Sequence, residues 1–221
     1  NYGSHDISVI TLEAPVTTVT PALLRRRELR SSDEDTELVS VGFGVTGPGN
    51  DDGGVKRSAT LLVDQLWQGF ILSRNAANPN EANICSGDSG GPMFQVTEGR
   101  LVEWAVHSWG DQYCSQRSGS TRTDMLYEWI MDQVEDVHGS RDLCEINGFY
   151  GDGWCDEDCP EEDVDCLPPV EADDDDSAAG DDDDSVDDNL GGEGCSDCSG
   201  GGSLALVGLV VAPWRRRRRG A

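Results

Sequence analysis

Short apolar runs separated by turn residues dominate the first two thirds of the chain. Apolar or β-branched stretches of strand length occur at 6–12, 39–45, 58–63, 91–96 and 101–109. Clusters of Gly, Asn, Asp and Pro separate them, and the longest cluster is 47–54. Short strands joined by Gly-rich turns are typical of an all-β barrel or sandwich.

One helix is predicted after the last of these runs. Between residues 124 and 137, apolar side chains recur at helical spacing, at Leu126, Trp129, Ile130, Val134 and Val137. Thr123 or Asp124 can cap the start of this helix. We therefore expect a β domain that is closed by a single helix.

The composition changes near Cys144. Residues 144–166 hold four cysteines and few apolar side chains, so a unit of this size needs disulfides or a metal to fold. Residues 172–188 consist almost only of Asp, Ser, Ala and Gly, which predicts a self-repelling, disordered linker. An apolar run at 204–214 and five arginines at 215–219 follow.

Charge excludes some functions. The chain has 221 residues, 43 acidic and 16 basic, and a net charge of -27. This balance excludes a nucleic-acid binder held by phosphate contacts, and 36% hydrophobic content excludes a multispanning membrane protein. Residues 1–141 contribute only -9, so most of the acidity lies in the later segments.

The most specific motif is Ile84-Cys85-Ser86-Gly87-Asp88-Ser89-Gly90-Gly91-Pro92. A serine among glycines can lie on a tight turn with its hydroxyl exposed, and nearby backbone N–H groups can converge on an oxyanion. The alternative is a Gly-rich β-turn without chemistry.

This motif resembles the nucleophile motif Gly-Asp-Ser-Gly-Gly-Pro of the trypsin/chymotrypsin-like serine proteases. Further segments resemble that family in the expected order: His5 to Val16 around its catalytic Asp, Val41-Gly42-Phe43-Gly44, Ser108-Trp109-Gly110 with Cys114, and Tyr127-Glu128-Trp129-Ile130 of its terminal helix. The resemblance covers residues 1 to about 138. It implies an all-β, trypsin-like double β-barrel with a C-terminal helix, of which this chain holds the end of the first barrel and all of the second.

The resemblance also implies roles for individual residues. Ser89 would attack the scissile carbonyl, and the N–H groups of Gly87 and Ser89 would form the oxyanion hole. Asp6 would orient the catalytic imidazole, although an ordinary strand-edge carboxylate is the alternative for this residue. Asp88 would form an ion pair with the α-amino group that zymogen cleavage creates.

The general base has no counterpart in the chain. In the family it lies about forty residues before the Asp, which falls upstream of Asn1. The three histidines are His5, His107 and His138, and His5 is a poor substitute because neighbouring strand residues point to opposite faces.

We therefore expect a fragment that is inactive alone, from a serine-type endopeptidase that cleaves extracellular polypeptides without a catalytic cofactor. The alternative is a catalytically inactive homologue that acts as a cell-surface binding protein.

Substrate preference depends on positions that the resemblance places around the specificity pocket. The substrate-binding strand would contain Ser108-Trp109-Gly110. Asn83 falls where trypsins carry the Asp that binds Arg or Lys, so tryptic specificity is not expected. His107 and Ser86 match positions of glutamate-selective members, so acidic substrates are one interpretation; the favoured one is that His107 is simply a satisfied barrel residue.

The resemblance to the proteases implies an oxidising compartment. The resemblance implies a disulfide between Cys85 and Cys114. Residues 142–168 resemble short Cys-rich modules of myxobacterial surface proteins and, more weakly, the calcium-binding Notch-type repeats. Hard oxygen ligands for Ca²⁺ would come from Asp152, Asp156, Asp163 and Asp165. The alternatives are an acidic knot without metal and, less favoured, zinc bound by four cysteines.

The C-terminus predicts anchoring. Eleven apolar residues span only about 16 Å as a helix, too little for a bilayer core of about 30 Å. The segment resembles the C-terminal sorting signals of myxobacteria, in which Cys195 or Cys198 would be the anchoring point; a fortuitous basic tail or a redox Cys pair is the alternative. We expect an exported, monomeric protein at the cell surface or outer membrane, or extracellular after processing. Its predicted parts are a partial protease domain at 1–138, the Cys-rich module at 142–168, a disordered linker at 169–193 and the sorting signal at 194–221.

Overall fold

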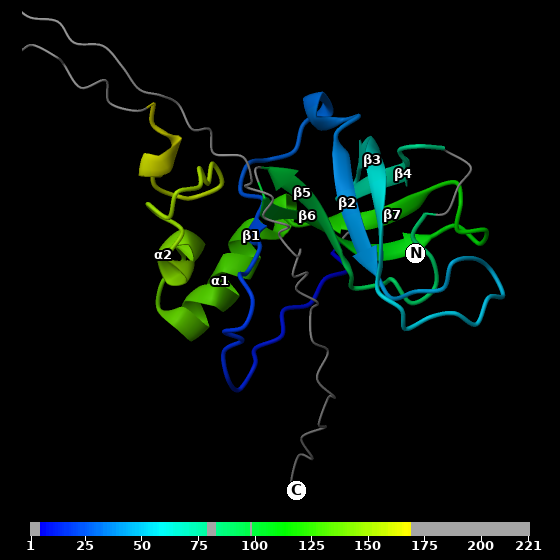
Figure 1. Cartoon of the computed structure of the whole chain (residues 1–221), viewed down its shortest axis with the longest axis horizontal. Helices are drawn as coiled ribbons and strands as arrows, with labels where there is room; N and C mark the ends of the chain where they lie inside the picture. Colours follow the sequence, from blue (N-terminus) through cyan, green and yellow to red (C-terminus); the bar gives the residue numbers. More distant parts are fainter. Residues whose placement is uncertain (1–4, 79–82, 98, 169–221) are drawn as a thin grey trace, which may run out of the picture. The chain divides into compact units, whose positions relative to one another are not determined.

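A computed structural model describes residues 5–78, 83–97 and 99–168. Its strands follow the order β1-β6-β5-β2-β3-β4-β7, and a further pairing of β6 with β7 closes six of them into a barrel (Figure 1). The strands are β1 (Leu23–Leu24), β2 (Glu37–Gly42), β3 (Arg57–Trp67), β4 (Phe70–Asn75), β5 (Pro92–Thr97), β6 (Arg100–Gly110) and β7 (Ser118–Arg122). The barrel pairs are antiparallel, and β1 joins β6 in parallel.

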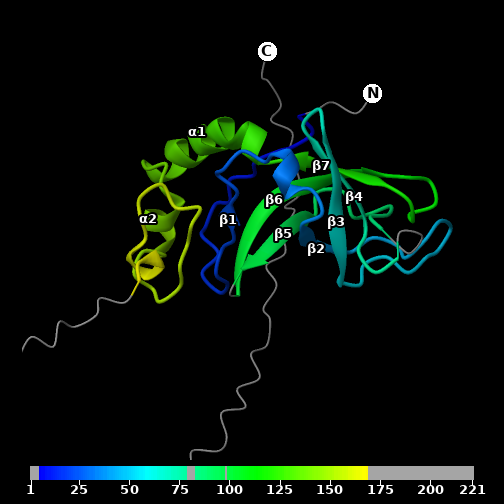
Figure 2. The ribbon, with the colours of Figure 1, turned by 90° about the horizontal axis from the view of Figure 1, so that it is seen from above.

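Two α-helices and three short 3₁₀ helices complete the described chain. They are η1 (Ser31–Asp33), η2 (Asp124–Leu126), α1 (Tyr127–His138), α2 (Leu143–Asn147) and η3 (Val164–Cys166). Figure 2, seen from above, shows β1 between the barrel and the segment that contains α2. The predicted all-β barrel with a C-terminal helix is confirmed.

Large apolar side chains from alternate strand positions fill the barrel. Those that are at most 1% exposed are Leu38, Leu61, Val63, Ile71, Met93 and Trp104. The same apolar cluster continues into the Cys-rich segment through Cys144, Phe149 and Cys159. The barrel and this segment therefore share one hydrophobic core.

Two local predictions are wrong. Residues 6–12 form no strand, because no described strand offers a partner for their backbone, and Val9, Ile10 and Leu12 are more than 40% exposed. Helix α1 has no side-chain cap. The Asp124 carboxylate instead accepts the N–H of Leu29 and pairs with Arg122, because tertiary partners displace the local cap.

Beyond these elements, the described chain gives three further findings. No helix within it combines the length and apolar character needed to cross a bilayer. Disulfides join Cys144 to Cys159 and Cys155 to Cys166. The predicted linker at 169–193 and sorting signal at 194–221, with Cys195 and Cys198, lie outside the described residues.

Candidate active site

The Ser89 hydroxyl is presented by a tight turn between two glycines. Gly87 has φ +95° and Gly90 has φ +83°, left-handed values that side chains other than glycine adopt at a cost. The turn is closed by a bond from the Gly91 N–H to the Asp88 carbonyl, 2.9 Å long. Ser89 is exposed at its apex, as a nucleophile must be.

Ser108, near the end of β6, links the two predicted catalytic side chains. Its hydroxyl donates to Asp6 Oδ2 at 2.6 Å, and its carbonyl accepts from the Ser89 hydroxyl at 3.3 Å. Ser108 thus contacts both Asp6, about one hundred residues earlier in the sequence, and Ser89, about twenty residues earlier. Neither His107, inside the barrel, nor His138, at the end of α1, lies between Asp6 and Ser89.

Two backbone donors face the same turn. Within the described residues, the N–H groups of Gly87 and Ser89 have no hydrogen-bond partner. Donors left free beside an exposed hydroxyl can stabilise the negative charge of a tetrahedral intermediate without prior rearrangement.

The Asp88 carboxylate points inward, away from Ser89. It accepts N–H bonds from Gly44 at 2.7 Å and from Cys85 at 2.9 Å. A Cβ atom at Gly42 would lie only 1.9 Å from Asp88 Oδ1, and one at Gly44 would lie 2.6 Å from the carboxyl carbon. The motif Gly42-Phe43-Gly44 therefore leaves the space that this carboxylate occupies.

Asn83 is held by a chain of side-chain hydrogen bonds. The Ser118 hydroxyl donates its proton to Asn83 Oδ1 at 2.8 Å. The Ser118 oxygen therefore accepts a hydrogen bond from the Ser73 hydroxyl, also at 2.8 Å. Asn83 Oδ1 also accepts the Ile84 N–H, and Nδ2 donates to the Ser73 carbonyl. Both acceptor positions of the amide are thus used, and one N–H has no partner among the described residues.

His107 is a structural support of the nucleophile turn. Its ring is 2% exposed, with Nε2 2.8 Å from Ser40 Oγ and Nδ1 3.0 Å from Ser120 Oγ. Burial lowers the pKa of His107 to about 4, so the ring is neutral near pH 7. Its backbone exchanges hydrogen bonds with the turn, donating to Gly91 and accepting from Gly90.

The Cys85–Cys114 disulfide fastens the segment before the nucleophile to the loop after β6. Its Cα atoms are 4.9 Å apart, and the Asn83 N–H donates to the Cys114 carbonyl beside it. A Cβ atom at Gly110 would lie 2.4 Å from the Ile84 carbonyl oxygen. Glycine is therefore required where the end of β6 approaches this segment.

The remaining predicted substrate-binding residues lie on the surface near the same strand end. Trp109 meets Phe70 edge-on, with ring centroids 6.3 Å apart, and its indole covers Gly119. Ser86 is exposed, and its carbonyl accepts the N–H of Val45.

The four aspartates predicted to bind Ca²⁺ all have partners within the protein. In the described ranges, no three Asp, Glu, His or Cys side chains are placed to hold a metal ion. Asp152 and Asp156 form ion pairs with Arg100. Asp163 and Asp165 accept backbone N–H bonds within their own loop. Although burial opposes its ionisation, these bonds lower the pKa of Asp163.

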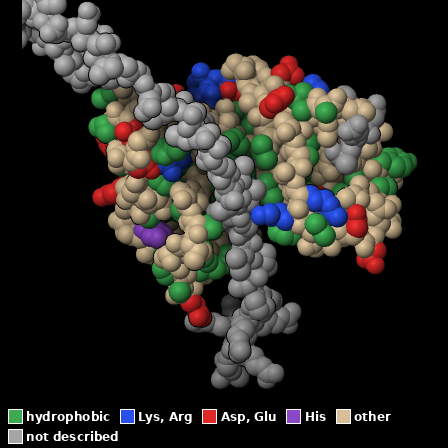
Figure 3. All heavy atoms as spheres, viewed as in Figure 1, with side chains coloured by type: hydrophobic (Ala, Val, Ile, Leu, Met, Phe, Trp, Pro, Cys, Tyr) green, Lys and Arg blue, Asp and Glu red, His purple; other side chains and the backbone are tan. Residues whose placement is uncertain are grey.

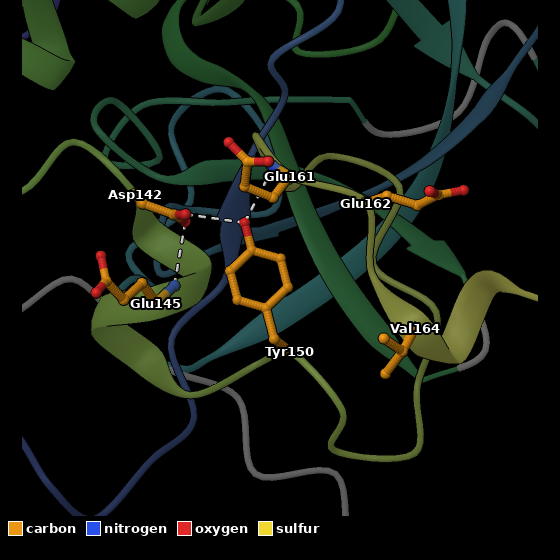
Figure 4. Close-up of a pocket in the computed structure, with 6 residues that line it drawn as sticks. All are labelled: Asp142, Glu145, Tyr150, Glu161, Glu162 and Val164. Carbon is orange, nitrogen blue, oxygen red and sulfur yellow. Dashed lines mark hydrogen bonds between the residues drawn. The ribbon is translucent and has the colours of Figure 1, made fainter.

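An open pocket of about 560 Å³ lies in the Cys-rich segment, and neither Ser89 nor Asp6 lines it (Figure 4). At its centre the Tyr150 hydroxyl donates to Asp142 and accepts the Glu161 N–H. Glu145, Glu162 and Val164 complete its lining. The Tyr150 hydroxyl already has two hydrogen-bond partners within the protein, so we assign no chemistry to this pocket.

Sequence reasoning did not identify the four serines that surround His107 and Asn83. They are Ser40, Ser73, Ser118 and Ser120. One signal was present, because Ser118 and Ser120 alternate with the period of a strand and both are fully buried in β7.

Comparison with known proteins extends this geometry. The family profile described as Trypsin matches residues 1–130. A trypsin from Saccharopolyspora erythraea is 33% identical over 142 residues, covering 58% of this chain and 60% of that protein. CLIP domain-containing serine protease B10 from Anopheles gambiae is 28% identical over 148 residues, with coverage of 60% and 40%. Spermosin from Halocynthia roretzi is 27% identical over 127 residues, with coverage of 52% and 32%.

Among solved structures, human heparin binding protein superimposes with a TM-score of 0.45 and 22% identity over 56% of this chain and 54% of that chain. A double mutant of the same protein gives 0.45 and 24% over 58% and 56%. This chain spans between about a third and three fifths of the length of the curated relatives named above.

Proposed function

The chain belongs to the trypsin family of serine proteases, and from this membership we propose that the protein is a serine-type endopeptidase that cleaves polypeptides through an acyl-enzyme. The observation that carries the proposal is the position of Ser108. It binds the Asp6 carboxylate with its hydroxyl and the Ser89 hydroxyl with its carbonyl, beside two free N–H donors.

In the proposed reaction, Ser89 Oγ attacks the scissile carbonyl and its proton passes to a histidine that lies outside these 221 residues. The oxyanion accepts hydrogen bonds from the N–H groups of Gly87 and Ser89. The histidine then gives the proton to the leaving amine. Water then attacks the acyl-enzyme: the histidine takes a proton from the water and returns it to Ser89 Oγ as the acyl group leaves. Asp6, held by Ser108, would fix the imidazole and stabilise its cation.

Asp88 supports a further part of this proposal. Its carboxylate is already turned inward and held by two backbone N–H groups. An α-amino group released by upstream cleavage would find this carboxylate in position, so activation would need the new amine more than a movement of Asp88.

For specificity, we propose a preference for side chains that carry a terminal oxygen, such as Gln or Glu, over Arg and Lys. Within the described residues, the amide of Asn83 has one N–H without a partner and no free acceptor, which favours an acceptor on the substrate. The buried, neutral ring of His107 supports the interpretation of this residue as a barrel support rather than a direct substrate ligand. Asn83→Asp should raise kcat/KM for Arg substrates relative to Gln substrates.

We further propose that the protein is exported. The three disulfides of the described residues suit an oxidising compartment and would be unusual in a reducing one. Anchoring through Cys195 or Cys198 remains a prediction, as does Ca²⁺ binding.

A fluorophosphonate probe tests the enzymatic proposal directly. The activated full-length protein should be labelled at Ser89, and Ser89→Ala should abolish labelling. Asp6→Asn should slow turnover by about 10⁴-fold, because the imidazole loses its orientation. A folded, processed protein that fails to react at Ser89 would instead support the inactive, binding homologue.

A further inference from the structure

A buried ion pair joins the barrel to the Cys-rich segment. Arg25, just after β1, donates to Asp158 at 3.2 Å, and both side chains are less than 10% exposed. The guanidinium also lies 4.7 Å from the centroid of the Trp104 ring on β6. Asp158 accepts the N–H of Arg26 as well, so this carboxylate is bound only by groups of the barrel side.

Arg100, at the start of β6, enters the Cys-rich segment in the same way. Its guanidinium pairs with Asp152 and with Asp156, whose side chain is 1% exposed. It lies 4.5 Å from the centroid of Phe149 and 6.0 Å from that of Trp154. A cation between two carboxylates and two aromatic faces occupies the place that the sequence suggested for a metal ion.

Apolar packing continues between these two ion pairs. Cys144, Phe149 and Cys159 belong to the same buried cluster as Leu23 and Trp104. The Cys144–Cys159 disulfide is thus part of the barrel's own core, with Cys144 completely buried.

We propose that residues 142–167 are an intramolecular partner of the protease barrel, docked through Arg25 and Arg100, and that the two fold and unfold as one unit. The recognition chemistry is a pair of barrel guanidinium groups against three carboxylates of the segment, over a shared apolar core. The interface would be the same in an active enzyme and in an inactive homologue.

The physical basis is the cost of leaving these charges buried without partners. In the part of the chain that the structure describes, Asp156 Oδ2 and the Nε atoms of both arginines have no hydrogen-bond partner, so opposite charge is their main compensation. Removing one partner of a buried pair is strongly destabilising, whereas removing both is much less so. If the segment were a separate tethered domain, neither effect would reach the barrel.

Thermal unfolding of the full chain under oxidising conditions tests the proposal. Arg100→Met keeps the apolar stem and removes the charge, and it should lower Tm by roughly 10 °C. The matched control is Arg74→Met, since Arg74 also holds two carboxylates, Asp35 and Asp64, but on the surface of β4. The control should lower Tm by no more than about 2 °C.

Disulfide reduction gives a second readout that does not depend on Tm. In Arg100→Met, Cys144 and Cys159 should be reduced and alkylated at least about ten times faster than in the unaltered chain. The Cys85–Cys114 disulfide, which is also buried but lies in the barrel, should be reduced faster by a similar factor, because the two parts open as one unit; faster reduction of Cys144–Cys159 alone would overturn the proposal.

A double substitution completes the test. Arg25→Met and Asp158→Asn should each lower Tm, and the pair together should lower it by clearly less than the sum. The proposal would be overturned if the two losses of Tm are additive, or if Arg100→Met lowers Tm no more than Arg74→Met does. Rapid reduction of Cys144–Cys159 in the unaltered chain would also overturn it.

Discussion

A buried titratable residue behind the nucleophile turn makes stability depend on pH. His107 contacts the hydroxyls of Ser40 and Ser120 and the backbone of Gly91, and none of these groups is charged. Protonation would therefore place an uncompensated cation in the barrel.

The resulting prediction concerns acid stability. The folded pKa of His107 is about 4 against 6.5 for the free side chain. The contribution of neutral His107 to the free energy of unfolding is complete above pH 6.5. As pH falls toward 4, up to about 3 kcal/mol of it is lost. Between pH 7 and 4.5, urea unfolding should show that His107→Gln gains stability relative to the unaltered chain by about this amount.

Glu103 acts in the opposite direction and is the control for that measurement. Burial raises the pKa of Glu103 from 4.5 to about 7. Its contribution is complete below pH 4.5 and is lost as pH rises through 7. Glu103→Gln should therefore raise the free energy of unfolding at pH 8. It should also make this free energy fall more steeply with decreasing pH, because Glu103 no longer offsets the loss from His107. Equal pH profiles for all three proteins would contradict both assignments.

A second residue-scale prediction concerns Gly42. Gly42→Ala places a Cβ atom 1.9 Å from the Asp88 carboxylate, so Asp88 and the turn that follows must move. Fluorophosphonate labelling of the full-length protein should become at least about ten times slower. Gly53→Ala is the matched control, because its nearest neighbours are 3.6 Å away and its backbone is unstrained. Equal labelling of the two variants would refute the requirement for space at Gly42.

At the scale of elements, β4 and β7 are paired through buried hydroxyl groups as well as through their backbones. Ser73 lies directly opposite Ser118 in the sheet, and both are 0% exposed. The sequence of β7, Ser118 to Arg122, is too polar to be identified as a core strand. Its hydroxyls are tolerated inside because neighbouring strands and Asn83 satisfy most of them.

This arrangement predicts coupling between the two strands. Ser118→Ala removes a donor from Asn83 and an acceptor from Ser73, and should cost about 1–3 kcal/mol of unfolding free energy. Ser73→Ala in addition should cost less than it does alone, because its hydroxyl has already lost that partner. Chemical denaturation of the two single variants and the double variant measures the coupling, and additivity would show that no hydrogen-bond chain exists.

At the scale of the whole molecule, charge is distributed rather than concentrated in the barrel. Figure 3 shows basic and acidic side chains near one another on the face it presents. Three disulfides also join cysteines of the described residues, and one of them closes a 29-residue separation. In the chain-entropy model such a loop contributes about 3–4 kcal/mol.

The chain should therefore fold only under oxidising conditions. Material produced in a reducing cytosol should have accessible Cys85, Cys114, Cys144 and Cys159, whereas exported material should not. Mass spectrometry after alkylation without reduction counts these thiols. Folded, fully reduced protein with a cooperative thermal transition would contradict the prediction and weaken the proposal of export.

The sequence by itself determined the fold class and the nucleophile motif. Alternating apolar runs, Gly-rich turns and one helical periodicity are local signals, and the glycines around Ser89 are required by local backbone geometry. The strands centred on 39–45, 58–63, 91–96 and 101–109 were therefore predicted correctly, whereas 6–12 was not, because a strand also needs a partner.

Only the tertiary structure decided which charges meet. Arg25 and Asp158 are 133 residues apart, and no local pattern distinguishes Arg100, which fills the acidic loop, from any surface arginine. Partners of this kind are selected by how the barrel packs against the Cys-rich segment, where burial turns a weak surface attraction into a strong requirement for pairing. The sequence therefore shows a cluster of aspartates, but not that an arginine from the barrel pairs with two of them.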